Sequence, residues 1–350
     1  MKNIDIINKI EKTQTASKEE LVCLLNTIND DEVEALRKKA QKIALNSFGN
    51  CVFIRGLIEI SSICKNDCYY CGLRKSNNKA VRYRLSKEDI LACCRAGYPL
   101  GFRTFVLQGG EDGYYSDDIM CDIVSSIHNE FPDCAITLSL GEKSKESYQR
   151  LFDSGASRYL LRHETADKEH YSKLHPLNMS LENRMNCLYN LKDIGFQTGA
   201  GFMVGSPYQT IEMIAEDLCF LQKLQPQMCG IGPFIPHKDT TFKNEKAGNV
   251  RLCLILISLV RLMHPQILLP ATTALGTVDE MGRESAILHG ANVVMPNLSP
   301  MEHRKDYMLY DNKICTGDEA AESIKSLKKR MSLIGYKIVV DRGDYGKGKD

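Results

Sequence analysis

The sequence lacks the apolar segments that secreted and membrane proteins carry. Its first residues, MKNIDIINKIEKTQ, contain no apolar core of the kind that a signal peptide has. The longest apolar stretch, Leu252–Met263, is interrupted by Ser258 and Arg261 and is too short to span a bilayer. We therefore expect a cytoplasmic protein.

The sequence also has little net charge. Its 45 Lys and Arg residues almost balance its 44 Asp and Glu residues, which leaves a formal charge of +1. This balance argues against nucleic acid or a membrane surface as the main partner. No low-complexity linker divides the 350 residues, so we expect one large domain with additions at both ends.

Cysteine, in contrast, is abundant. The chain has 14 cysteines and no secretion signal, which indicates a reducing compartment in which thiols stay free or bind metal. Three of them, Cys64, Cys68 and Cys71, lie close together in a Cys-x3-Cys-x2-Cys run. Thiolates are the ligands of iron–sulfur clusters, and three thiolates on a [4Fe–4S] cluster leave one iron open. An open metal position favours a catalytic site over a structural one.

Two other interpretations of these cysteines are weaker. A cysteine is often buried simply as a small hydrophobic residue, but the residues between Cys64 and Cys68 are polar. A structural zinc site normally needs a fourth ligand at matching spacing, and the sequence has no second Cys-x2-Cys pair. The ligand type and spacing therefore predict an open iron–sulfur cluster, which also implies low-oxygen conditions.

Strand-like and helix-like segments alternate after residue 50. Short apolar runs are typical of parallel strands that are buried on both faces. Eight such strands are expected, at Cys51–Ile60, Thr104–Gln108, Ala135–Leu140, Arg158–Arg162, Gln197–Met203, Met228–Phe234, Ile267–Thr272 and Asn292–Met295. Helices are expected to start near Ser86, Ser116, Ser144, Leu181, Thr210, Val250 and Asp279.

This pattern predicts an α/β fold, a closed (β/α)8 TIM barrel over residues 51–300. Residues 1–50 form an N-terminal helical extension in this scheme, with helices over 18–47 and Asn29 or Asp30 as a cap. Residues 301–350 form a C-terminal extension that closes the barrel. An open, doubly wound sheet is the alternative.

Polar and glycine-rich runs follow several expected strands, where a barrel places its active site. Paired glycines let a backbone approach a ligand closely, and a guanidinium group holds a carboxylate bidentately. The residues that stand out are Gln108, Gly109, Gly110, Glu111, Arg162, His163, Glu164, Arg184, Thr272 and Thr273.

Each of these positions also has an ordinary structural explanation. The glycine pair can be a simple turn, and His163 can be a general base or a neutral residue in a hydrogen-bond network. Arg184 can form a surface ion pair with Glu182. A threonine in a strand can be there because strands favour β-branched residues.

The cysteine spacing, with Tyr70 beside the third cysteine, resembles the radical S-adenosylmethionine (SAM) superfamily. The resemblance implies that SAM chelates the open iron and that one electron cleaves it to methionine and a 5′-deoxyadenosyl radical. Tyr70 is then expected near the adenine. Residues that match SAM-binding positions are Gln108, Gly109, Gly110, Glu111, Glu164 and Arg184.

Longer signatures carry a narrower resemblance. Arg-His-Glu-Thr-Ala, Gly-Ala-Gly-Phe-Met-Val-Gly, Gly-Ile-Gly-Pro-Phe-Ile-Pro-His and Pro-Ala-Thr-Thr-Ala-Leu-Gly-Thr are similar to the HydE family of [FeFe]-hydrogenase maturases. The resemblance implies a small substrate, a cysteine-bound iron carbonyl cyanide unit on the way to a diiron precursor. Residues that match positions of the substrate cavity are Arg162, Met228, Thr272, Thr273, Tyr307 and Tyr310.

Biotin synthase and methylornithine synthase are similar in the cluster loop. Biotin synthase needs ligands for a second cluster, which the sequence does not offer, whereas a methylornithine synthase-like reaction on an amino acid stays an alternative. A non-enzymatic cluster carrier is less consistent with three cysteines, because an electron carrier needs a fully ligated cluster.

Some HydE-family members carry an auxiliary cluster on a Cys-x7-Cys-x2-Cys run near the C-terminus. Here Cys315 is present, but the next two positions are Ser323 and Ser326. Serine hydroxyls are poor ligands for iron–sulfur clusters beside thiolates. We therefore predict a single [4Fe–4S] cluster.

A local basic run follows the cysteines in this nearly neutral chain. It consists of Arg74, Lys75, Lys79, Arg82 and Arg84. Such a run can receive an acidic electron donor such as a flavodoxin or ferredoxin, and the alternative is an ordinary solvated loop. The other hydrogenase maturases are the further partners that the resemblance implies.

Overall fold

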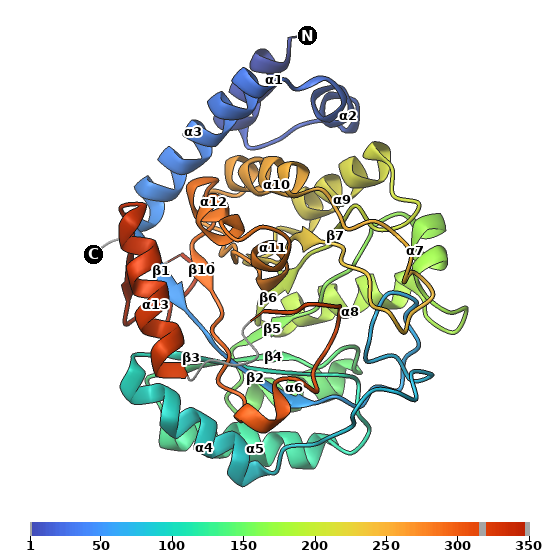
Figure 1. Cartoon of the computed structure of the whole chain (residues 1–350), viewed down its shortest axis with the longest axis vertical. Helices are drawn as coiled ribbons and strands as arrows, with labels where there is room; N and C mark the ends of the chain where they lie inside the picture. Colours follow the sequence, from blue (N-terminus) through green and yellow to red (C-terminus); the bar gives the residue numbers. More distant parts are fainter. Residues whose placement is uncertain (1, 315–319, 347–350) are drawn as a thin grey trace.

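Three helices precede the barrel in the computed structural model, which describes residues 2–314 and 320–346. They are α1 (Asn3–Thr13), α2 (Lys18–Thr27) and α3 (Asp30–Phe48). Ser17 and Asn29 cap α2 and α3 by accepting from the backbone amides of Glu20 and Glu32. The side chains of Glu20 and Glu32 in turn accept from the backbone amides of Ser17 and Asn29, which completes two capping boxes. Figure 1 shows this helical extension projecting from one side of the molecule.

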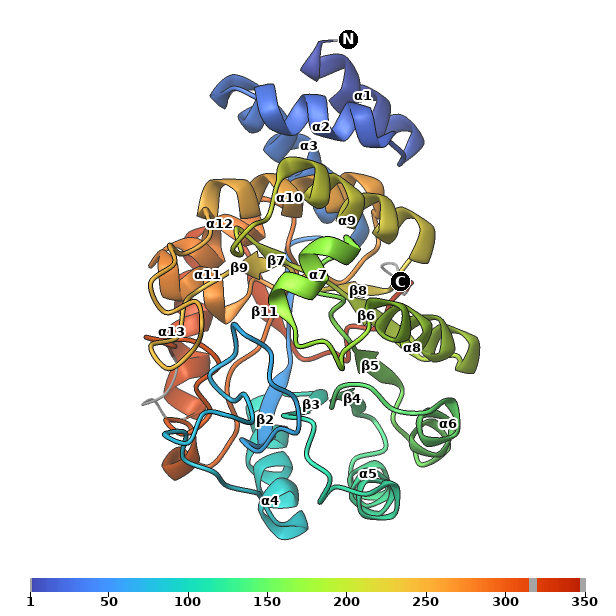
Figure 2. The same cartoon turned by 90° about the vertical axis from the view of Figure 1, so that its right-hand side faces the viewer.

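Six parallel strands form most of the barrel wall, in the order β2-β3-β4-β5-β6-β8. Figure 2 shows them curving around a common centre. They are β2 (Gly56–Ser61), β3 (Thr104–Gly109), β4 (Ala135–Ser139), β5 (Arg158–Leu160), β6 (Gln197–Ala200) and β8 (Met228–Cys229). The predicted first strand is divided at Arg55 into β1 (Cys51–Ile54) and β2. β1 pairs with β10 (Val293–Val294) and β11 (Lys337–Val339), whereas β2 pairs with β3.

Single parallel bridges close the remaining arc of the ring. Met228 pairs with Leu268, and Pro270 pairs with Val293 of β10 (Val293–Val294). β10 in turn pairs with β1 in parallel. The ring is therefore closed, and the open doubly wound sheet is wrong.

The predicted seventh strand, residues 267–272, forms these bridges but no regular ladder. Pro270 interrupts the ladder because proline has no backbone N–H to donate. A separate short pair, β7 (Met203–Val204) with β9 (Gly232–Pro233), extends the wall beyond β6 and β8.

Helices cover the outside of the barrel (Figures 1 and 2). They are α4 (Lys87–Gly97), α5 (Asp117–Glu130), α6 (Lys145–Asp153), α7 (Lys168–Leu174), α8 (Leu181–Ile194), α9 (Ile211–Leu224), α10 (Val250–Met263), α11 (Thr273–Val278) and α12 (Gly282–Leu288). Two single 3-10 turns, η1 (Tyr98–Leu100) and η2 (Met301–His303), complete this part. Ser86, Ser116, Ser144 and Thr210 cap their helices, as their positions predict.

The helix boundaries differ from the prediction in two places. The helix expected near Asp279 starts at Gly282, after a separate short helix α11 that the strand pattern concealed. The apolar run Leu252–Met263 is α10, which is buried on almost every face and packs against α3. Within the described residues, no helix combines the length and apolar character needed to cross a membrane.

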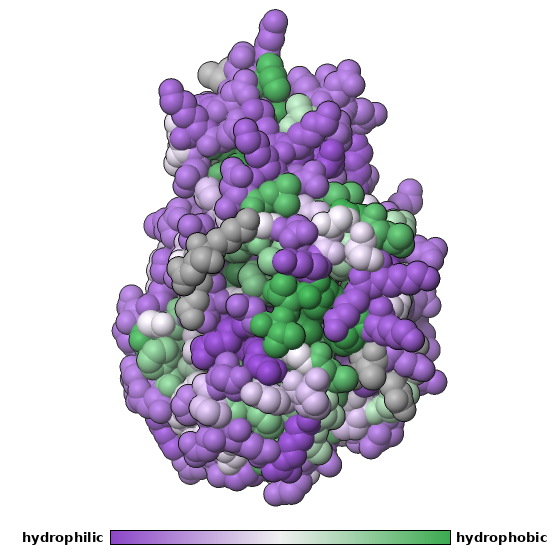
Figure 3. Space-filling view, turned by 90° about the vertical axis from the view of Figure 1, so that its left-hand side faces the viewer, coloured by the Kyte–Doolittle hydropathy of each residue, from purple (hydrophilic) through white to green (hydrophobic). Residues whose placement is uncertain are grey.

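The C-terminal segment closes the N-terminal end of the barrel. α13 (Ala320–Leu333) leads into β11 (Lys337–Val339), which pairs with β1 in parallel. The chain then reaches Arg158, which is fully buried and donates from Nη2 to Asp344 Oδ1 (2.7 Å) and to the carbonyl oxygens of Arg342 and Gly343 (2.8 and 3.1 Å). Figure 3 shows an apolar area on this side of an otherwise hydrophilic surface.

The ion pair between Arg158 and Asp344 is expected to hold this closing segment in place. Replacing Asp344 with Ala leaves the buried Arg158 charge uncompensated, so we expect a loss of about 3 kcal/mol in the free energy of unfolding, measured by urea denaturation. The matched control is Asp118→Ala, which removes an exposed ion pair with Arg150 and should cost less than about 1 kcal/mol. Equal effects of the two changes would contradict this role.

Candidate functional site

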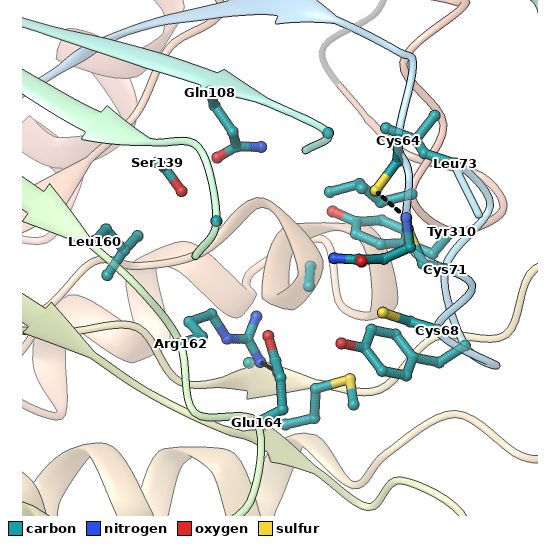
Figure 4. A pocket seen from close by; sticks show the side chains of 18 of the residues that line it. Cys64, Cys68, Cys71, Leu73, Gln108, Ser139, Leu160, Arg162, Glu164 and Tyr310 are labelled. Carbon is teal, nitrogen blue, oxygen red and sulfur yellow. Dashed lines mark hydrogen bonds and ion pairs between the residues drawn. The ribbon is translucent and has the colours of Figure 1, made fainter. Parts of the chain in front are cut away.

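A cavity of about 300 Å³ lies at the carboxyl ends of the barrel strands. Figure 4 shows the three cysteines on one side of it and Arg162 and Glu164 on the other. Most site residues predicted from the sequence line it: Cys64, Cys68, Tyr70, Cys71, Gln108, Gly109, Gly110, Glu111, Arg162, Glu164, Arg184, Thr272, Tyr307 and Tyr310. Residues far apart in the sequence therefore meet in one chamber.

Two predicted residues lie outside this lining. Met228 is buried on β8 among apolar side chains, and its Sδ accepts from Arg55 Nη1 (3.0 Å). Thr273 is the first residue of α11, whereas Thr272 caps that helix by accepting from the Leu275 amide and lines the cavity. The two threonines thus face different surroundings, because a helix begins between them.

The cysteine loop, residues 62–85, follows β2 and packs against three other segments. The amide of Lys65 donates to Glu111 O (2.9 Å), that of Tyr69 to Leu174 O (3.0 Å), and that of Gly72 to Leu309 O (2.9 Å). These bonds come from the loop after β3, from α7 and from the segment after η2. The loop that carries the thiols is therefore held by the barrel mouth and by the segment after η2 together.

The three thiols are free and half-buried on this loop. Burial raises the pKa of Cys71 to about 12 and raises the pKa values of Cys64 and Cys68 as well. Thiols with raised pKa values stay protonated at neutral pH unless a metal binds them, because the metal displaces the proton. Without a metal, the three groups are therefore neutral thiols at neutral pH.

The arrangement fits an iron–sulfur cluster better than a zinc ion. In the part of the chain that the structure describes, no three His, Cys, Asp or Glu side chains converge as ligands of one metal ion must. A [4Fe–4S] cluster needs its thiolates on different irons, spread around its own volume. Three cysteines that line one end of a cavity provide that kind of donor set.

The glycine pair after β3 brings this loop close to the barrel. A Cβ atom on Gly110 would lie 2.2 Å from the carbonyl oxygen of Ile63, so only glycine fits there. Next to it, the side chain of Glu111 accepts from the Glu142 amide (3.2 Å) and pairs with Lys65 (3.1 Å). The Gly-Gly-Glu run is thus a packing element of the site and not only a turn.

Tyr70 is anchored inside the cavity by a histidine. The Nδ1 atom of His175 donates to the Tyr171 carbonyl (3.0 Å), so its Nε2 accepts from the Tyr70 hydroxyl (3.2 Å). Burial lowers the pKa of His175 to about 3, which keeps this ring neutral. The phenol ring is therefore fixed beside Cys68 and Cys71.

Arg184 is buried and pairs with Glu142 (2.8 Å), not with Glu182 as one interpretation of the sequence had it. Burial by itself lowers the pKa of Arg184, but the carboxylate of Glu142 outweighs it and raises the pKa, so the guanidinium stays charged. The sequence offered no signal for this partner, which belongs to the loop after β4.

Arg162 and Glu164 form an ion pair across the cavity floor (2.9 Å). Glu164 adopts a left-handed backbone conformation with φ of 67°, which is strained for a residue with a side chain. Apart from this ion pair, the buried Nε of Arg162 has no hydrogen-bond partner within the described structure. Such an atom can bind a polar ligand that enters the cavity.

His163 lies between these two residues but points away from the cavity. Its Nδ1 accepts from the Gly201 amide (3.3 Å), and its Nε2 lies 3.2 Å from Asp217 Oδ1 on α9. Burial lowers the pKa of His163 to about 3. The histidine is thus a neutral member of a buried network, and the general-base interpretation is not supported.

Four of the five basic side chains after the cysteines are used inside the protein. Arg74 pairs with Asp67 (2.8 Å), Lys79 with Asp239 (3.0 Å) and Arg84 with Asp112 (2.7 Å). Arg82 donates to four carbonyl oxygens of its own loop, those of Ser62, Leu73, Arg74 and Asn77. This run mainly stabilises the cysteine loop.

The prediction missed several lining residues. Asn66, Met203 and Ile235 contribute side chains to the cavity. Met203 and Ile235 stand in the glycine-rich and proline-rich runs after the fifth and sixth strands, which were a usable signal. Asn66 lies within the cysteine loop itself.

The chain is similar to known proteins over almost its whole length. Residues 58–221 match the model of the radical SAM superfamily. The [FeFe] hydrogenase maturase subunit HydE of Thermotoga maritima is 44% identical over 97% of this chain and 96% of its own length. The 3-methylornithine synthase of Methanosarcina acetivorans is 30% identical over 91% of this chain and 89% of its own.

Solved structures agree in fold. The methylornithine synthase PylB matches with a TM-score of 0.83 at 28% identity, over 95% of this chain and 97% of its own. HydG, a maturase of the [FeFe]-hydrogenase, matches with a TM-score of 0.81 at 19% identity, over 96% of this chain and 75% of its own. At that identity the second likeness shows the fold alone.

The buried His163 predicts a specific pH dependence of stability. Its pKa is about 3 in the folded protein and about 6.5 when unfolded, so the unfolded state binds more protons between these values. Its contribution is therefore complete above pH 6.5 and is lost as the pH falls toward 3, by up to about 1.4 kcal/mol per pH unit. The free energy of unfolding, measured with urea at pH 7, 6 and 5, should fall less steeply with decreasing pH in His163→Gln than in wild type. An unchanged slope would contradict the neutral, buried state of this ring.

Proposed function

The chain belongs to the radical SAM superfamily, within the family of the [FeFe]-hydrogenase maturase HydE, and we propose that it builds part of the hydrogenase active-site cluster. It is a radical SAM enzyme whose cofactors are a [4Fe–4S] cluster and S-adenosylmethionine. The proposed substrate is a small, cysteine-bound iron carbonyl cyanide unit, which the reaction converts toward the diiron subcluster. The observation that carries this proposal is the 44% identity to HydE over 97% of the chain.

Cys64, Cys68 and Cys71 are the proposed ligands of the cluster. They share one loop at the barrel mouth and line the same cavity. A cluster held there would supply the one electron that cleaves SAM to methionine and a 5′-deoxyadenosyl radical. The hydrogen bonds from this loop to Glu111 and Leu309 fix the position of the cysteines relative to the rest of the cavity.

SAM is proposed to lie between the cysteines and the far wall of the cavity. Gln108, Gly109, Gly110 and Glu111 offer backbone groups and a carboxylate for its methionine part. The proposed contacts of its remaining polar groups are Tyr70, Glu164 and Arg184. The Glu164 carboxylate, which pairs with Arg162 in the structure, can also accept from ribose hydroxyls or the amino group, and Arg184, which pairs with Glu142, can also bind a carboxylate.

The substrate is proposed to bind deeper in the same cavity. Arg162 pairs with Glu164 through Nη2 (2.9 Å), whereas its buried Nε has no hydrogen-bond partner within the described structure, which suits an anionic sulfur ligand. Thr272, Tyr307 and Tyr310 line the adjoining wall, and Gln108 Nε2 donates to the Tyr307 hydroxyl (3.3 Å). Met228 and Thr273, the other two proposed substrate contacts, lie outside this lining.

The proposed surroundings of the reaction follow from its chemistry. The cluster needs one electron per turnover, and a reduced flavodoxin or ferredoxin is the proposed donor. The other hydrogenase maturases are the proposed source and recipient of the substrate unit, and a cytoplasmic location is proposed.

A methylornithine synthase-like reaction is the second candidate, because a 3-methylornithine synthase is 30% identical over 91% of this chain. An amino acid substrate would also use Arg162 to bind its carboxylate. Incubation of the reduced enzyme with SAM and lysine distinguishes the two functions, since formation of 3-methylornithine supports the second.

The maturation function is tested by activation of apo-hydrogenase in a purified system that lacks only this protein. We expect hydrogenase activity to appear when the protein and SAM are added, together with 5′-deoxyadenosine. Arg162→Gln should strongly reduce activation, because it removes the charge proposed to hold the substrate, while SAM cleavage persists. Failure of the wild-type protein to support any activation would overturn the maturase function.

A single cluster on the three cysteines gives a further expected result. Anaerobic reconstitution should load about four irons per chain, and Cys68→Ala should lower the iron content and abolish 5′-deoxyadenosine formation. The control is Cys121→Ala, because Cys121 lies on α5 outside the cavity lining. This substitution should leave the iron content and the formation of 5′-deoxyadenosine unchanged. Iron analysis that finds about eight irons per chain would show a second cluster.

A further inference from the structure

A second cavity, of about 320 Å³, lies on the outer side of the cysteine loop. Three separate segments line it: residues 72–81 of the loop, residues 237–239 after β9, and residues 305–308 after η2. We call this cavity the outer groove. Figure 2 shows the cysteine loop standing in front of the barrel.

The outer groove has an apolar centre and a basic rim. Leu73, Ala80, Val81 and Met308 supply the apolar part, and Val81 is 57% exposed although it is a valine. Ala80 and Met308 are half-buried beside it, so the groove offers a small apolar surface next to its charges.

Lysines provide the charge of the rim. Lys79, Lys238 and Lys305 are exposed, and the acidic lining residues are Asp239 and Asp306. Asp239 pairs with Lys79 (3.0 Å), and Asp306 lies 3.4 Å from His303. Lys238 and Lys305 have no ion-pair partner within residues 2–314 and 320–346. With three lysines against two aspartates, the rim carries a small excess of positive charge.

The groove and the cluster cavity share one wall. Leu73, two residues after Cys71, lines both of them. In the segment after η2, Lys305, Asp306 and Met308 face the groove, whereas Tyr307, Leu309 and Tyr310 face the cavity.

The packing of this shared wall is tight. The Gly72 amide donates to Leu309 O (2.9 Å), and a Cβ atom on Gly72 would lie 2.2 Å from Met308 O. Only a single layer of chain thus separates a partner in the groove from the proposed cluster site.

We propose that the outer groove is the docking site of an acidic one-electron donor protein. The inference rests on the proposed function, since radical SAM chemistry needs one electron per turnover. The reduced donor loses one electron, the cluster gains it, and no bond forms or breaks in the groove. Positive charge at the rim attracts an acidic donor, and the apolar centre around Val81 packs against its surface.

This surface differs from the basic run that follows the cysteines in the sequence. Only Lys79 belongs to both, because Arg74, Arg82 and Arg84 are held by internal bonds. Lys238 and Lys305 come from distant parts of the chain, and only the fold brings them beside Lys79.

The test measures binding and electron transfer separately. Reduced flavodoxin serves as the acidic donor, and its dissociation constant for the reconstituted enzyme is measured at low salt. The double change Lys238→Glu and Lys305→Glu should weaken binding at least about tenfold and slow flavodoxin-driven cluster reduction to a similar degree. Val81→Asp, at an exposed position that tolerates a polar side chain, should act in the same direction.

The matched control reverses two exposed lysines of α13, as Lys325→Glu and Lys328→Glu. This variant changes the net charge equally but lies away from the groove, so binding should equal that of wild type. Reduction by dithionite, which needs no docking site, should be the same in all variants. High salt should remove the difference between wild type and the groove variant.

Several outcomes would overturn the proposal. Unchanged flavodoxin binding in the groove variant, or an equal loss in the α13 control, would show that the groove is not the docking site. If inorganic phosphate bound specifically in the groove and displaced flavodoxin, the groove would be a small-anion site. The same would hold if phosphate bound there and flavodoxin did not bind at all. A failure of SAM cleavage with dithionite would instead count against the proposed function, because flavodoxin binding does not require cleavage.

Discussion

Four ion pairs hold ionised side chains inside the barrel and its cavity, where burial of an unpaired charge costs several kcal/mol. At one end of the barrel Arg158 meets Asp344, and on β2 the buried Glu59 meets Lys313. At the cavity Arg162 meets Glu164, and Arg184 meets Glu142.

These pairs tie together segments that are far apart in the sequence. Asp344 and Lys313 both belong to the chain after the barrel, so the C-terminal segment completes the interior and is more than an appendage. Lys313 also donates to the Tyr307 carbonyl (2.9 Å), and Asn297 Nδ2 donates to Glu59 (3.0 Å). The wall that carries Tyr307 is therefore held in place from inside the barrel.

Much of the site was predictable because parallel barrel strands end at the same mouth. Cys64, Gln108 and Arg162 follow different strands, and this alone brings them together. Arg162 and Glu164 face the cavity whereas His163 faces outward, although all three residues come after the end of β5 and Glu164 has a left-handed backbone. The ion-pair partner of Arg184 was not predictable, because Glu142 lies 42 residues before it in the sequence. The burial of Met228 outside the cavity lining was not predictable either, because its sequence context is that of any strand residue.

The C-terminal helix gives a physical reason why one cluster can suffice. α13 packs through Ile324, Leu327 and Met331, which are buried at helical spacing, and Arg330 pairs with the buried Glu284. Ser326 is exposed and Ser323 is half-buried on the same helix, while Cys315 lies outside the described residues. Apolar packing and one ion pair already attach this helix to the barrel, so its position does not depend on a metal that its serines are poorly suited to bind.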